Sequence, residues 1–142
     1  MEYMVADIAI VKALERSEAI QQLTYGRVFN TARPEMDEQE DKIPYIVVNY
    51  FGMENEVDNK DMYEGCEDDE KVEVLCVARD RVQLANLMNE ARKACRSFLN
   101  SKECYDEFRT ASYQVRASQI MRDVTVPCDY QQLIYSISTD IS

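Results

Sequence analysis

The stretch VEVLCVARDRVQLANLMNEARKACRSFL, residues 72–99, decides the fold class of this 142-residue chain. Its first part alternates, so residues 72, 74, 76 and 78 share one face of a predicted strand and residues 75 and 77 share the other. Apolar residues then recur every three or four positions, which is the pattern of a helix with one buried face. This stripe consists of Leu84, Leu87, Met88, Ala91, Cys95, Phe98 and Leu99. The stretch therefore predicts a strand that leads directly into a long amphipathic helix.

The join between these two elements is Ala78-Arg79-Asp80. In many enzymes such a join cradles a phosphate, but a cradle of this kind depends on glycines, and this join has none. Aspartate is a favoured residue at the N-cap of a helix, where its carboxylate accepts a hydrogen bond from a free backbone amide. We therefore expect Asp80 to cap the helix and to take no part in chemistry.

Towards the N-terminus, the pattern predicts a helix over residues 4–15 and a strand over Tyr45–Phe51, just after Pro44. The helix is expected to place Met4, Ile8, Val11 and Leu14 roughly on one side. The strand sequence YIVVNYF is bulky at successive positions, which indicates that both of its faces are at least partly covered.

Towards the C-terminus, alternation predicts strands over residues 112–121 and 129–138. The short link of residues 122–127 favours an antiparallel hairpin. We therefore predict one α+β domain spanning residues 1–142, with a mixed or mostly antiparallel sheet of about four to five strands and two main helices packed on it.

The net charge of −11 is concentrated in two segments. Residues 35–41 carry five acids and no base, and residues 54–70 carry nine acids and one lysine, which leaves a net +2 for the rest of the chain. Neither segment has strong apolar periodicity, so we expect two acidic loops at about 33–43 and 53–70. Such loops are solvated surface in most proteins, and they also repel or steer charged partners.

The composition argues against most catalytic chemistry. The chain has no histidine, which is the commonest general base and a common metal ligand, and it lacks both a Walker loop and a GxGxxG motif. A calcium-hand pattern starting at Asp58 fails, because Lys60 and Met62 stand where acids are needed. We expect no catalytic residues, no cofactor and no dedicated metal site, and the basic residues form no patch typical of sequence-specific nucleic-acid binding.

The five cysteines, Cys66, Cys76, Cys95, Cys104 and Cys128, form no CxxC pair and no zinc spacing. We expect Cys76 and Cys95 to be small buried hydrophobes in a reduced, cytoplasmic setting. The longest apolar run, Ile43–Phe51, is far shorter than the roughly 20 residues that span a bilayer. The N-terminal MEYMVADIAIVK has no basic region ahead of its apolar residues, so it does not resemble a signal peptide.

Nearly the whole chain resembles the small phage tail completion proteins, also called tail terminators or head–tail joining proteins. The resemblance is carried by a helix and a leucine-containing turn, and then by Gly26-Arg27-Val28-Phe29 and Ile43-Pro44-Tyr45-Ile46-Val47-Val48. The long helix and last pair of strands follow in the family's order. The acidic segment at 54–70 is longer than that family leads us to expect, and the strong acidity is a departure from it.

The resemblance implies a non-enzymatic virion protein, assembled in the bacterial cytoplasm and located at the head-proximal end of the tail. It implies a ring of identical subunits, often a hexamer, with the tail tube protein and the head connector protein as partners. DNA passing through such a ring must not stick, and contacts between phosphates and basic side chains would add affinity. We therefore expect some acidic side chains to face the lumen or a basic partner surface, from the set Glu35, Asp37, Glu38, Glu40, Asp58, Asp61, Glu67, Asp68 and Asp69.

Two other classes of function remain open from the sequence. One is a cytosolic interaction module, such as a dimeric adaptor, that binds a basic partner through the acidic loops. The other is a metal-dependent hydrolase built on those loops, which cation-dependent stabilisation and phosphoester turnover would reveal.

Overall fold

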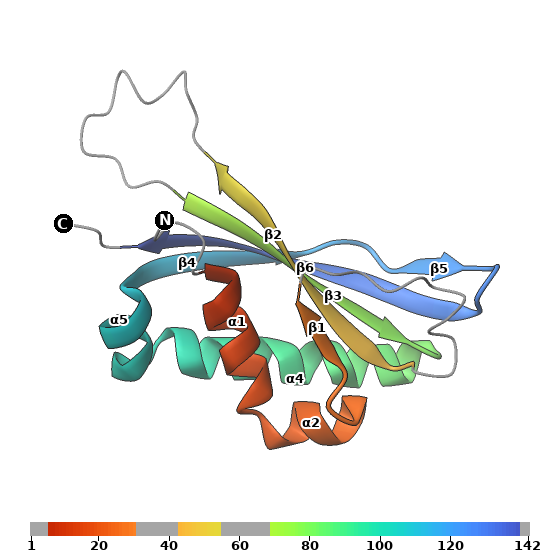
Figure 1. Ribbon diagram of the computed structural model, residues 1–142. Helices are drawn as coiled ribbons and strands as arrows, with labels where there is room; N and C mark the ends of the chain where they lie inside the picture. The colour runs from red at the N-terminus through yellow and green to blue at the C-terminus, as the bar shows by residue number, and fades with distance from the viewer. Residues whose placement is uncertain (1–5, 31–42, 55–68, 140–142) are drawn as a thin grey trace.

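A computed structural model describes residues 6–30, 43–54 and 69–139 of the chain (Figure 1). Its helices are α1 (Ala6–Glu15), α2 (Glu18–Thr24), α4 (Arg81–Leu99) and α5 (Lys102–Phe108). Its strands are β1 (Val28–Asn30), β2 (Tyr45–Glu54), β3 (Asp69–Ala78), β4 (Thr110–Ala117), β5 (Met121–Asp123) and β6 (Cys128–Thr139). The predicted α+β class is confirmed. The described residues form six strands, however, rather than four to five, and two short helices accompany the two main ones.

The six strands form one mixed sheet in the order β1-β2-β3-β6-β4, and β5 also pairs with β6. The pairing of β1 with β2 is parallel, and the other pairings are antiparallel. The helices lie together on one face of the twisted sheet (Figure 1). We call this the helical face, and we call the opposite side the open face.

The strand and helix predicted from residues 72–99 are β3 and α4, and the predicted stripe of α4 is buried. The even-numbered positions from Val72 to Ala78 join the core on the helical face, and Leu75 and Val77 are buried on the other side. Asp80 caps α4, since its carboxylate accepts a hydrogen bond of 2.8 Å from the Gln83 amide. The prediction of a structural join is therefore confirmed.

A second, smaller core lies on the open face near one end of the sheet. Tyr45 and Val47 of β2 contribute to it, while Ile46 and Val48 of β2 belong to the main core, so both faces of this strand are covered as predicted. The remaining buried members of this second core are Ile43, Leu75, Val77, Val126 and Cys128.

The buried side of α1 differs from the predicted one. Ile8 is 48 % exposed, whereas its buried residues are Ala6, Asp7, Ala9, Ile10, Ala13 and Leu14. Three of these are alanines, whose small side chains allow a close approach of the helix to its neighbours. The pattern of large apolar residues therefore identified the helix but assigned Ile8 to the wrong side.

The strand predicted at residues 112–121 is interrupted after Ala117. There the Ser118 amide donates to the Gln132 carbonyl at 2.9 Å, and the Ser118 hydroxyl accepts from the Gln132 amide at 3.0 Å. A side-chain hydroxyl thus replaces a backbone carbonyl in the ladder, which separates β4 from β5. The predicted hairpin is confirmed, because β5 and β6 pair antiparallel.

Strands β2 and β3 extend into residues predicted to be acidic loop. Glu54 ends β2 and Asp69 begins β3, and the two are paired in register. The short helix α5 was not predicted; its N-cap is Ser101, whose hydroxyl accepts from the Cys104 amide. In the part of the chain that the structure describes, no helix is both long enough and apolar enough to span a bilayer.

Candidate functional site

Only one of the nine acidic side chains proposed from the sequence lies within the described residues. That residue is Asp69, at the start of β3. The other eight lie outside the described residues: Glu35, Asp37, Glu38, Glu40, Asp58, Asp61, Glu67 and Asp68. The start of β3 is thus the part of the predicted acidic surface that can be described in atomic terms.

Asp69 is half-buried and is bound to the neighbouring strand β6. Its carboxylate accepts hydrogen bonds from the hydroxyls of Ser138 and Ser136, the latter at 3.4 Å. Strand alternation places Asp69 on the open face, with Lys71 and Glu73. Asp69 therefore contributes its charge to a sheet surface, where its position is set by hydrogen bonds.

Further along the open face, Glu73 forms a polar cluster that the sequence did not reveal. Its carboxylate accepts hydrogen bonds from the Asn49 amide at 2.8 Å and from the Gln132 side-chain amide. Glu73 is buried, so these two donors replace the water that it loses. The three side chains come from β2, β3 and β6, and they give the middle of the open face a polar surface.

On the helical face, near the start of β3, two acidic side chains are buried. Glu70 is 2 % exposed and accepts a hydrogen bond from the Ala6 amide, while the neighbouring Asp7 is 6 % exposed. Burial raises the pKa of Glu70, and the carboxylate of Asp7 raises it as well, against the lowering effect of hydrogen bonds from Ala6 and Tyr50. Burial raises the pKa of Tyr50 to about 12, and the neighbouring carboxylate of Glu70 contributes to this rise. Tyr50 therefore remains a hydrogen-bond donor at physiological pH.

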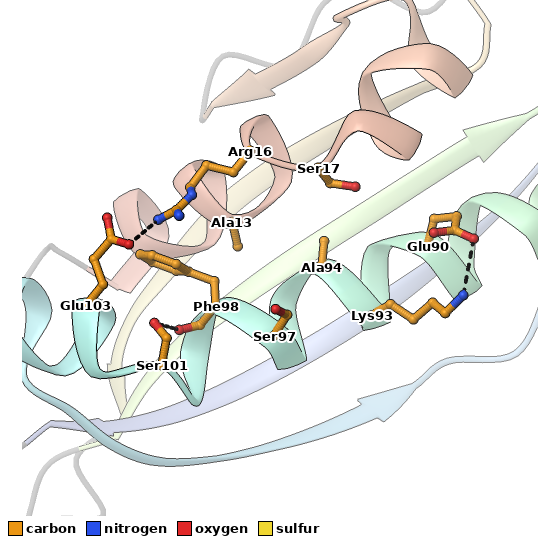
Figure 2. A pocket seen from close by; sticks show the side chains of 10 residues that line it. All are labelled: Ala13, Arg16, Ser17, Glu90, Lys93, Ala94, Ser97, Phe98, Ser101 and Glu103. Carbon is orange, nitrogen blue, oxygen red and sulfur yellow. Dashed lines mark hydrogen bonds and ion pairs between the residues drawn. The ribbon is translucent and has the colours of Figure 1, made fainter.

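A groove of about 470 Å³ runs along the helical layer between α1, α4 and the start of α5 (Figure 2). Small side chains, a single aromatic ring and several charged groups line it: Ala13, Arg16, Ser17, Glu90, Lys93, Ala94, Ser97, Phe98, Ser101 and Glu103. Arg16 bridges across it to Glu103 at 2.7 Å and also lies over the Phe98 ring, 5.1 Å from its centroid.

Most polar side chains of this groove make contacts that stabilise the fold. Ser17 and Ser101 cap α2 and α5 by accepting hydrogen bonds from backbone amides, and the chain has no histidine to activate a hydroxyl. Glu90 pairs with Lys93 at 3.6 Å (Figure 2). Ser17 and Ser101 therefore serve as helix caps, and the charged side chains of the groove are held in ion pairs.

The described cysteines are also unsuited to nucleophilic chemistry. Cys76, Cys95, Cys104 and Cys128 are all free and buried, and burial raises the pKa of each thiol, that of Cys95 to about 12. They therefore remain protonated thiols at neutral pH, and the predicted burial of Cys76 and Cys95 is confirmed. Cys66 lies outside the described residues. Within the described ranges, no group of three or more Cys, Asp or Glu side chains is arranged to hold a metal ion.

The β5–β6 hairpin exposes three large apolar side chains within five residues. Val124 is 85 % exposed, and Ile120 and Met121 are also exposed. The hairpin projects past the start of α4 at the end of the molecule away from the described chain ends (Figure 1). The sequence signal was present in VTVP at residues 124–127, but alternation alone did not show which of these side chains are buried. Val126 faces the second core, and Val124 faces outward.

No protein-family model matches the sequence, and no curated protein matches it either.

Proposed function

We propose that the protein is a structural virion component that caps a phage tail tube and joins it to the head connector, acting as a ring of identical subunits. The proposal begins with the sequence resemblance carried by Gly26–Phe29 and Ile43–Val48. In the described structure these segments are β1 with its preceding turn, and β2 with the residues just before it, paired in parallel at one edge of the sheet.

The observation that carries the proposal is the exposed apolar hairpin. Val124, Met121 and Ile120 are exposed apolar side chains close together in the sequence, and burying such side chains in a contact with another protein is favourable. A hairpin that projects from one end of a subunit meets a different surface on the next copy. Contacts of this heterologous type close into rings when the rotation between subunits allows it.

The character of the remaining surfaces supports the same function. The described cysteines are buried, and Ser17 and Ser101 of the groove cap helices. The open face offers a polar surface around Glu73, and the sequence of residues 54–70 carries a charge of −8, to which Asp69 at the start of β3 belongs. An acidic surface beside a DNA channel would repel the phosphate backbone.

The test is size-exclusion chromatography with light scattering across a concentration series, with and without tail tube protein from the same phage or prophage. The double variant Met121→Asp/Val124→Asp should raise the concentration needed for assembly at least about tenfold, because burying two carboxylates in a contact costs more than 1.4 kcal/mol. Val82→Asp is the matched control, since Val82 is 73 % exposed on α4 and lies outside the hairpin.

A ring that the double variant weakens and the control leaves intact is the expected result. A wild-type protein that stays monomeric in every condition, tail tube protein included, would contradict the proposal. A stable dimer that does not respond to tube protein would favour the interaction-module function instead.

A further inference from the structure

The N-terminus of α1 is held against the start of β3 through Glu70. The Ala6 amide donates a 3.4 Å hydrogen bond to Glu70 Oε1, across 64 positions of sequence. Tyr50 of β2 donates a second hydrogen bond to the same carboxylate. Because the amino end of a helix carries partial positive charge, this is a favourable place for a single carboxylate.

A second buried carboxylate lies near enough to Glu70 to act on it electrostatically. Asp7 follows Ala6 directly, it is 94 % buried, and its Oδ1 atom has no hydrogen-bond partner. Among the described residues, the groups that act on Glu70 are the Ala6 amide, the Tyr50 hydroxyl and the Asp7 carboxylate. Strand β6 contributes Ile137 at the position paired with Glu70, which is apolar. Both donors are neutral, so they do not cancel the charge of two carboxylates.

Two nearby carboxylates that are both shielded from water cannot both remain ionised without a large cost. A bound proton removes one of the charges and needs no additional space. The described residues supply two carboxylates here and no third acidic ligand for a metal ion. These observations favour a proton over a cation as the neutralising species.

We propose that Glu70 binds a proton next to the buried carboxylate of Asp7, and that this protonation forms a pH-sensitive latch that fastens the start of α1 to the start of β3. When the proton is bound, the Glu70 carboxyl group accepts the Ala6 and Tyr50 hydrogen bonds without placing a second negative charge beside Asp7. When the proton leaves, the two carboxylates repel each other across the contact between α1 and β3. This inference does not depend on ring assembly.

The sign of the effect follows from the shift of Glu70. Its pKa is raised above the ordinary 4.5 in the folded protein, mainly by burial, so the folded state binds this proton more tightly than the unfolded state does. The stabilisation is complete below the ordinary carboxyl pKa and is lost as the pH rises through the raised folded pKa. For each pH unit by which the folded pKa of Glu70 exceeds its unfolded pKa, the melting temperature should fall by roughly 4–6 °C as the pH rises across that window.

The experiment is thermal unfolding of the full chain between pH 4.5 and 8.5, for the wild type and four variants. Glu70→Gln should remove the fall in melting temperature that the latch causes, and Asp7→Asn should reduce it. Tyr50→Phe should extend the fall to higher pH, because the lost hydrogen bond had lowered the pKa of Glu70. Asp106→Asn is the control, since this acid is exposed on α5 and pairs with Lys102; it should follow the wild-type profile.

Hydrogen exchange of the α1 and β2–β3 peptides, corrected for intrinsic rates, provides a second readout. Protection at the start of α1 should fall across the same pH window in the wild type and stay constant in Glu70→Gln. Equal pH profiles for the wild type and Glu70→Gln in both measurements would overturn the latch. So would a rise in wild-type melting temperature with magnesium or calcium at pH 8 that Asp7→Asn abolishes, because the pair would then hold a cation instead of a proton.

Discussion

Replacing Leu87 with alanine tests the packing of α4 against the sheet, which underlies the fold. Leu87 is fully buried in the main core and belongs to the buried stripe of α4. The change removes three buried carbons, worth roughly 0.8 kcal/mol each, or about 2.4 kcal/mol in transfer free energy. The cavity that remains adds to this loss, so the expected destabilisation is about 3–4 kcal/mol.

Urea unfolding monitored by circular dichroism measures this loss, with Val82→Ala as the matched control. Val82 belongs to the same helix but is 73 % exposed, so its truncation should change the unfolding free energy by no more than about 0.5 kcal/mol. Leu87→Ala should lower the urea midpoint without changing the slope of the transition, because the folded state stays compact. A loss below about 1 kcal/mol for Leu87→Ala, or equal losses for both variants, would refute the assigned face of α4.

Three further changes test other local features of the fold. Asp80→Ala should lower the unfolding free energy by about 1 kcal/mol in the same assay, because the Gln83 amide loses its hydrogen-bond acceptor. Asp80→Asn should keep most of the wild-type stability, because asparagine also caps helices. Arg16→Ala should cost no more than about 1 kcal/mol in a salt-dependent manner, since its pair with Glu103 is exposed; a larger loss would mean that α1 depends on this bridge. Thiol labelling at pH 8 should leave four cysteines unreacted until the protein unfolds, namely Cys76, Cys95, Cys104 and Cys128. Rapid labelling of any of these in the folded state would contradict their burial.

The elements that were predicted well are those with strong periodicity. Strand β3 and helix α4 both carry a regular apolar pattern, and Asp80 marks the boundary between them, so sequence spacing determines their faces. The hairpin between β5 and β6 followed from its short link. These features depend on local spacing, which a single sequence records directly.

The features that were missed depend on contacts between distant residues. Glu70 ends the acidic run that was expected to be a solvated loop, and Glu73 follows in the predicted strand. Both are buried, and Ala6, Asn49 and Gln132 supply hydrogen-bond donors to them from other elements. No spacing rule reveals such partners in advance. Burial of a carboxylate is settled by the tertiary structure around it.

The break between β4 and β5 and the orientation of α1 have the same kind of cause. Ser118 interrupts the ladder because its hydroxyl meets the Gln132 amide, and a serine within an alternating run gives no sign of this. Ile8 is exposed because the alanines of α1 face the sheet instead, which reflects the close approach of the helix. The candidate acidic surface is known here only at Asp69, and its other residues stay a prediction from the sequence.

Electron microscopy of tail tubes assembled in the presence of the protein tests the proposed function most directly. We expect a ring of subunits at one end of each tube and shorter tubes as the ratio of this protein to tube protein increases. The Met121→Asp/Val124→Asp variant should leave most tubes without a ring, whereas Val82→Asp should behave as the wild type does. Tubes with two bare ends and unchanged lengths, while the protein remains free in solution, would contradict the account.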